Sequence, residues 1–111
     1  MAILIKTPDP GHLLSNLTTD IRGGKIPSWL LDQKSDLTPT CEETRYRVWF
    51  LPKSGIGLLT FSIFGHPEKE DGNRIYAKTH ASLVDMLLEH YSLHFADALV
   101  TKRGQSPSDL F

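Results

Sequence analysis

The longest run of regularly spaced hydrophobic positions in the chain lies in residues 79–103. Its apolar side chains recur every three or four residues, which places them on one stripe of an α-helix. Thr79 or Ser82 can cap the start, and Lys102 and Arg103 suit a carboxyl-terminal end. The pattern predicts a long C-terminal helix whose buried stripe consists of Leu83, Val84, Leu87, Leu88, Tyr91, Phe95, Ala98 and Leu99.

A shorter amphipathic segment lies near the N-terminus. Asp9 can cap a helix that begins with Pro10, because proline has φ preset and no amide hydrogen to satisfy. The glycines at 23 and 24 end the pattern. A first helix is therefore predicted from Pro10 to about Arg22.

Alternating or β-branched residues between these helices predict strands joined by short turns. Residues 65–73 are rich in glycine and charge and are predicted to form a mobile loop. The apolar run at residues 2–5 could add an edge strand or form an ordered arm. The expected strands are residues 29–31, 37–40, 44–51, 56–64 and 73–78, with turns at 32–36 and 52–55.

Short connections favour antiparallel neighbours. We expect an α+β two-layer sandwich in the order α-β-β-β-β-α, with a meander of four to five antiparallel strands and both helices on one face. The inward strand residues would be Tyr46, Val48, Phe50, Leu59, Phe61, Ile63, Ile75 and Ala77. The helices would add Leu14, Leu17, Ile21, Leu83, Leu87, Leu88, Tyr91 and Phe95.

Composition narrows the class of protein. A chain of 111 residues has room for one domain, expected over residues 1–103, with a flexible tail at 104–111. The formal net charge of -1 gives no bulk attraction to nucleic acid or membrane. Cys41 is the only cysteine, which excludes an internal disulfide and suits a reducing compartment. The opening MAILIK is neither a signal peptide nor a membrane span, so we expect a cytoplasmic protein without a cofactor.

A set of short elements is distributed over residues 29–90. The elements are Trp29, Asp36-Leu37-Thr38, the stretch 48–52 (VWFLP), Ile75-Tyr76-Ala77, His80, Met86-Leu87-Leu88 and His90. Together they resemble a family of small bacterial proteins that has no assigned activity. The resemblance implies a bacterial source and a free-standing single domain, and it supplies no catalytic residue.

The outward face of the predicted sheet is the first candidate site. Basic and aromatic side chains on a flat sheet can hold phosphates and stack on bases of a single strand. The same composition is also typical of an ordinary solvated face, and apolar neighbours there could instead be covered by a partner. The candidate residues are Arg45, Arg47, Trp49, Arg74, Tyr76 and Lys78.

A second candidate lies on the predicted long helix. His90, His94 and Asp97 fall at i, i+4 and i+7, within roughly one-sixth of the circumference at ~100° per residue. Such a set could bind one divalent metal for hydrolysis. The alternative is that both histidines border the buried stripe, with Asp97 accepting a hydrogen bond from one of them.

No catalytic set is evident. No nucleophile signature surrounds Cys41, and the glycine pairs match no phosphate-binding loop. We therefore expect a non-enzymatic binding module that acts through a homodimer or a protein partner. Single-stranded nucleic-acid binding and metal-dependent hydrolysis are the alternatives.

A second apolar line on the predicted helix bears on the homodimer. Met86, Leu93 and Val100 are seven residues apart and lie away from the main stripe. A heptad line beyond the core-facing stripe predicts a seam that a second copy covers.

Overall fold

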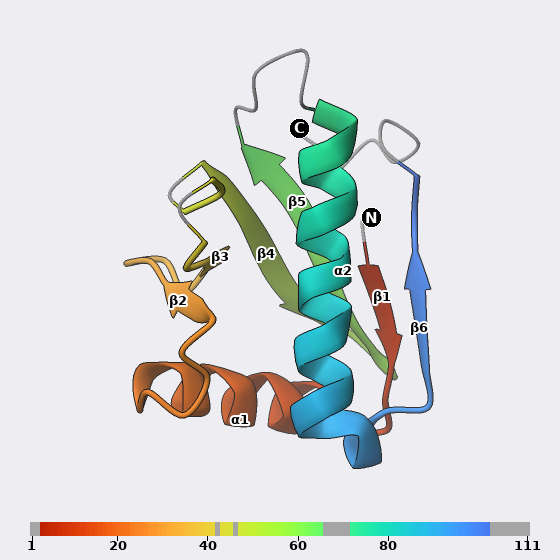
Figure 1. Ribbon diagram of the computed structural model, residues 1–111. Helices are drawn as coiled ribbons and strands as arrows, with labels where there is room; N and C mark the ends of the chain where they lie inside the picture. Colours follow the sequence, from red (N-terminus) through yellow and green to blue (C-terminus); the bar gives the residue numbers. More distant parts are fainter. Residues whose placement is uncertain (1–2, 42, 46, 66–71, 103–111) are drawn as a thin grey trace.

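The computed structural model describes residues 3–41, 43–45, 47–65 and 72–102 (Figure 1). It is an α+β protein with one antiparallel sheet and two helices, as predicted. The elements are β1 (Ile3–Lys6), α1 (Pro10–Arg22), β2 (Trp29–Leu31), β3 (Leu37–Pro39), β4 (Val48–Ser54), β5 (Leu58–Gly65), α2 (Gly72–Tyr91), the 3-10 turn η2 (Ser92–His94) and β6 (Asp97–Val100).

Within the described residues the sheet has six strands in the order β2-β3-β4-β5-β1-β6, rather than the four or five expected. Strands β2 to β5 form the predicted meander. The N-terminal run is a strand, but it lies between β5 and β6 instead of at an edge. The two added strands come from the two ends of the described chain, and β6 forms one edge of the sheet.

Helix α1 has the predicted bounds because its capping residues work as expected. The Asp9 carboxylate accepts a hydrogen bond from the His12 amide at 3.1 Å, and Pro10 opens the first turn. Leu13, Leu17 and Ile21 are buried at helical spacing. The helix therefore packs against the sheet through one stripe.

The β4–β5 hairpin provides the centre of the core. Val48 and Phe50 of β4, and Leu59, Phe61 and Ile63 of β5, face inward as predicted. Strand β4 begins at residue 48 rather than 44 and continues through Pro52 to residue 54, so the turn lies at residues 55–57. The ladder between β3 and β4 is registered at the Leu37–Phe50 pair, which leaves Pro52 past the end of β3, where a missing amide hydrogen breaks no ladder bond on that side.

The predicted strand at residues 73–78 is wrong, because this segment forms the first turns of α2. Its buried residues are spaced as on a helix rather than alternating: Ile75, Tyr76, Thr79, His80 and Leu83. Ala77 was expected inward and is exposed. The long helix thus begins about seven residues earlier than the hydrophobic stripe alone suggested.

The long helix also ends earlier than predicted. It stops at Tyr91 instead of continuing to residue 103, and β6 then pairs antiparallel with β1. The Thr7 hydroxyl donates to the His94 carbonyl at 2.6 Å, and the Ala96 amide donates to the Lys6 carbonyl at 2.8 Å. These long-range bonds to the N-terminal segment override a helix-compatible sequence.

The core contains most of the expected side chains. Leu88 is an exception, with 53% of its surface exposed, and Leu14 and Phe95 are only partly buried. The Tyr91 hydroxyl donates to Asp20 at 2.7 Å, which joins α2 to α1. Burial and this contact raise the pKa of Tyr91.

Three predicted features lie outside the described residues: Tyr46, the loop centre at 66–71 and the tail at 104–111. The core members that the predicted core did not include are Ile3, Ile5, Leu13, Ile26, Trp29, Leu37, Tyr76 and Met86.

Candidate functional site: an open sheet edge and its groove

A groove of about 640 Å³ runs between α2 and the edge strand β6. Figure 1 shows α2 crossing in front of the sheet while β6 lies to its side. The lining is mostly apolar, with polar groups at the rim. It consists of Asn73, Tyr76, Ala77, His80, Ala81, Val84, Val100 and Lys102.

The groove exists because the sheet is wider than the helix layer. Ala98 and Val100 pair with Ile5 and Ile3 and share their side of the sheet. The two isoleucines are fully buried, whereas Val100 is 46% exposed. The inner face of β6 is therefore a continuation of the core that no described element covers.

Strand β6 presents an unpaired backbone edge as well. It pairs with β1 on one side, and no strand of the described chain lies on its other side. Its central residues are Ala98, Leu99 and Val100, with Leu99 60% exposed on the outer face. An apolar edge strand without proline or central charge is a template for pairing with another chain.

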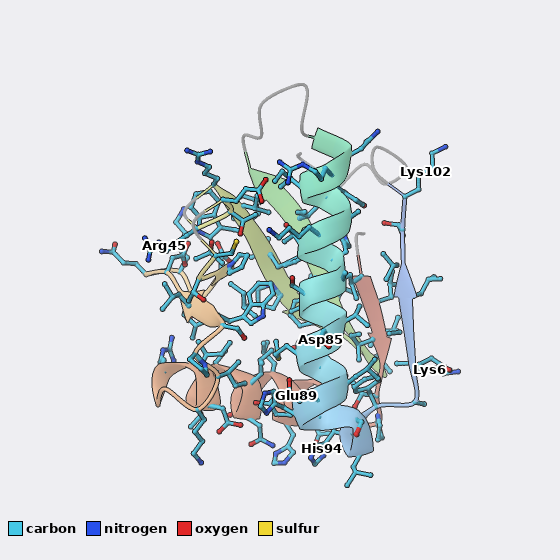
Figure 2. The ribbon with its side chains drawn as sticks, in the orientation of Figure 1. Lys6, Arg45, Asp85, Glu89, His94 and Lys102 are labelled. Atoms are coloured by element: carbon cyan, nitrogen blue, oxygen red, sulfur yellow. The ribbon has the colours of Figure 1, made fainter. Side chains whose placement is uncertain are left out.

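The ends of this edge carry opposite charges. Asp97 begins β6 opposite Lys6 of β1, and Lys102 follows its other end. Figure 2 shows Lys6 and Lys102 near opposite ends of the strand pair. Strand β6 itself therefore has a carboxylate at its start, opposite Lys6, and an amine just beyond its end.

A buried pair of aromatic rings on α2 forms part of the wall of the groove opposite β6. The His80 and Tyr76 rings stack with centroids 4.0 Å apart, and His80 Nδ1 lies 2.6 Å from the Tyr76 carbonyl oxygen. The Tyr76 hydroxyl donates to the Thr101 carbonyl at 2.8 Å. This bond joins the first half of α2 to the segment that follows β6, so the groove has a fixed width at that end.

The predicted sheet-face site is divided by the structure. Trp49 lies on the outer face of β4, and Arg45 and Arg47 are exposed in the turn before it. Figure 2 shows Arg45 extending away from the sheet. The other three residues, Arg74, Tyr76 and Lys78, belong to α2 and do not extend this face.

Two of those residues form an ion-pair cluster with Glu43. The Lys78 amine lies 2.9 Å from the Glu43 carboxylate, and the Arg74 guanidinium also contacts it. The hydrogen bonds from Arg74 and then Lys78 lower the pKa of Glu43 to about 2, and the bond to Glu43 raises the pKa of Lys78. The cluster joins the β3–β4 connection to α2, a structural role that sequence spacing did not predict.

Cys41 lies next to this cluster. Its sulfur is 3.6 Å from the Lys78 amine, and hydrogen bonding from the Glu43 backbone together with the Lys78 charge lowers the pKa of the thiol. The described side chains that contact the thiol are those of Lys78 and Thr44, and neither is a general-base histidine.

The helical metal set is not assembled. His90 is on α2, His94 is on η2 and Asp97 is on β6, so the one-face spacing of a continuous helix is lost. Within the described ranges no group of three His, Cys, Asp or Glu side chains could hold a metal ion.

The predicted dimer seam is not a line on one helix. Met86 is buried in the core, Leu93 is 97% exposed on η2, and Val100 lies on β6. Only Val100 remains at the groove. The helix ends between these residues, so heptad spacing has no geometric meaning there.

The chain was compared with protein families, curated proteins and solved structures. No protein-family model, no curated protein and no solved structure matches the chain. No helix in the described part of the chain is long and apolar enough to cross a membrane.

Proposed function

We propose that this chain is a protein-interaction module that forms a homodimer by antiparallel pairing of β6 with β6 of a second copy. The observation that carries the proposal is the uncovered inner face of β6 beside its open backbone edge. Addition of a strand at such an edge supplies backbone hydrogen bonds, and the neighbouring groove supplies apolar contact area. The single cysteine favours a cytoplasmic setting for this module.

Charge supports a second copy as the occupant. In a twofold antiparallel pair, the start of one strand lies beside the end of the other. Asp97 of each copy would then approach Lys102 of its partner at both ends of the interface. The edge is thus complementary to itself, which an unrelated partner would match only by chance.

The exposed flank of α2 supports the same arrangement. Ala77, Ala81, Val84 and Leu88 follow at spacings of four, three and four residues and border the groove side of the buried face. Joining two sheets edge to edge would bring the two copies of α2 over the shared strands. The small side chains at 77 and 81 would allow close approach, and the uncovered β6 residues would become core.

Sedimentation equilibrium tests the proposal with a variant inside the groove. Val100→Glu places a charge in the apolar interface, and we expect it to convert a wild-type dimer into a folded monomer. Leu93→Glu is the matched control, because residue 93 is an equally apolar but almost fully exposed position on η2. It should leave the dimer intact.

Circular dichroism melts of both variants show that each is folded when sedimentation is measured. A wild-type monomer at tens of micromolar would contradict the proposal. So would a dimer that Val100→Glu leaves unchanged, because a different surface would then hold the copies together.

A further inference from the structure

The groove between α2 and β6 is elongated. The part of its lining that belongs to α2 is a single stripe at helical spacing. This stripe consists of Asn73, Tyr76, Ala77, His80, Ala81 and Val84. From its first to its last residue it spans roughly 16 Å, at about 1.5 Å of rise per residue. The groove therefore runs along the helix for about three turns.

The middle of the groove offers apolar surface. Its two polar side chains, Tyr76 and His80, are buried and make hydrogen bonds within the fold, from the Tyr76 hydroxyl to the Thr101 carbonyl and between His80 Nδ1 and the Tyr76 carbonyl. The other groups there are the methyls of alanine and valine. The body of a ligand must therefore be apolar, because a polar one would lose hydrogen bonds to water without gaining new ones.

One end of the groove is polar and basic. Lys102 is exposed there, and it is the one residue of the described lining with a permanent charge. Asn73 lies at the same end, because Tyr76, one turn later on α2, is bonded to Thr101. Figure 2 shows Lys102 near the end of β6 that is remote from Lys6. Its charge is carried on a long flexible stem, so the amine can follow an anionic group at the mouth of the groove.

Length, polarity and charge together specify a class of ligand. The volume of about 640 Å³ lies within the range of about 300 to 1,000 Å³ that is usual for small-molecule sites. An unbranched alkyl chain matches an elongated apolar groove, and a carboxylate head complements Lys102. An alkyl amine would be repelled at that end, and a compact polar molecule would leave the apolar lining in contact with water.

We propose that this groove binds an unbranched alkyl carboxylate, with its chain along α2 and its head group at Lys102. The chain covers the exposed Ala77 and Ala81 and the half-exposed Val100, which removes apolar surface from water. The hydrogen bond between Tyr76 and Thr101 fixes the width of the polar end in the free protein. Little ordering is therefore needed when the ligand binds.

Ligand binding goes beyond the proposed dimer and does not require it. Pairing uses the backbone edge of β6, whereas the ligand uses the inner face that carries Val100. In a dimer the second copy would also approach this inner face, so the two occupants would compete for it. Leu99→Lys separates them, because it places a charge on the outer face of the edge strand and leaves the groove lining intact.

Proton–carbon NMR correlation spectra of the methyl groups test the site, with signals assigned by substitution. Decanoate, decan-1-ol and decylamine are titrated separately, each below the concentration at which it forms micelles. Decanoate should give saturable shifts of the methyl signals of Ala77, Ala81 and Val100. The methyl signals of Leu93, an exposed residue of η2 beyond the other end of α2, should not shift.

Two substitutions, each with a matched control, locate the ligand. Ala81→Phe fills the groove and should weaken decanoate binding at least about tenfold, whereas Ala81→Ser keeps the side chain small and should weaken it less than about threefold. Lys102→Gln removes the charge at the mouth and should weaken binding about two- to fivefold, the scale of an exposed ion pair. Lys6→Gln, the same change near the opposite end of the strand pair, should leave the affinity unchanged.

The three head groups test the charge of the ligand. Decanoate should bind more tightly than decan-1-ol, and decan-1-ol more tightly than decylamine, because Lys102 attracts the first and repels the last. Equal affinities would show that the chain alone is recognised and would overturn the assignment of a carboxylate. Tightest binding of decylamine would overturn it as well.

Absence of a saturable shift with decanoate in both wild type and Leu99→Lys would overturn the proposal. Decanoate affinity that Ala81→Phe leaves unchanged would also overturn it, because the ligand would then lie elsewhere. Leu99→Lys should bind decanoate at least as tightly as wild type, whatever state of association sedimentation finds, and weaker binding would place the ligand outside the groove. Failure of the dimer and failure of the ligand site therefore give different results.

Discussion

Asp36 lies in an environment that opposes the charge of its carboxylate. Its carboxyl is buried, has an orphaned oxygen and lies near a second carboxylate. At neutral pH, Asp36→Asn should raise the free energy of unfolding by about 1 kcal/mol, because it removes a buried charge and its repulsion by Asp32 while a polar side chain of the same shape remains. Urea denaturation measures the gain, and Asp85→Asn should change stability by less than about half a kcal/mol.

The pH dependence of that gain follows from the direction of the pKa shift. A raised pKa in the folded state means that the folded protein holds its proton more tightly, so ionised Asp36 opposes folding. The penalty is present above the folded pKa and absent where both states are protonated. The advantage of Asp36→Asn should therefore vanish as the pH falls below about 4. An advantage that grows on acidification would contradict this account.

Leu87 tests the packing of the core. It is fully buried on α2, so Leu87→Ala should lower the free energy of unfolding by about 2 to 5 kcal/mol through lost contacts and a residual cavity. Leu93→Ala, the same change at an exposed site, should cost less than about half a kcal/mol. If denaturant melts gave similar losses of unfolding free energy for both variants, α2 would not bury Leu87 as described.

At the scale of elements, Glu43 joins the β3–β4 connection to α2 through Arg74 and Lys78. Its pKa is lowered to about 2, so its contribution to stability is present above its ordinary value of 4.5 and is lost as the pH falls toward 2. Glu43→Gln should melt below wild type at neutral pH. The difference in Tm should narrow as the pH falls from 4.5 toward 2, because Glu43 is then protonated. It should also narrow with added salt, because the cluster is partly exposed.

A Tm difference for Glu43→Gln that stays constant from pH 7 to the acid range would rule out the ion pairs as its cause. Arg22→Gln is a suitable comparison, since Arg22 is an exposed cation that donates to the Ser35 hydroxyl rather than to a carboxylate. The difference in Tm between Arg22→Gln and wild type should not narrow as the pH falls from 4.5 toward 2.

Elements defined by local signals could be predicted from the sequence. The Asp9-Pro10 start and the glycine stop set the bounds of α1, and strict alternation at Leu59, Phe61 and Ile63 set the inner face of β5. Their geometry depends on neighbours in the chain. Such signals need no knowledge of distant segments.

Elements defined by distant partners could not be predicted in this way. Residues 97–100 continue an apolar spacing that suits a helix, yet they form a strand because β1 presents an edge from the other end of the chain. The site residues follow the same division. Trp49 was found by alternation, whereas the β6 groove depends on contacts between segments far apart in sequence.

At the scale of the whole molecule, the two edges of the sheet differ. Strand β2 forms one edge and has buried or half-buried residues, whereas all four residues of β6 are exposed at the other. The two edge strands thus differ in the burial of their side chains, and pairing through β6 would cover the more exposed of the two.

Amide hydrogen exchange of the edge strands, compared at low and high protein concentration, tests the β6 pairing most directly. The account predicts that amides in β6 exchange more slowly as concentration rises, because dimer formation protects the outward-facing edge. Amides in β2 should exchange at the same rate at every concentration. Exchange in β6 that is independent of concentration, or protection that appears at β2 instead, would contradict it.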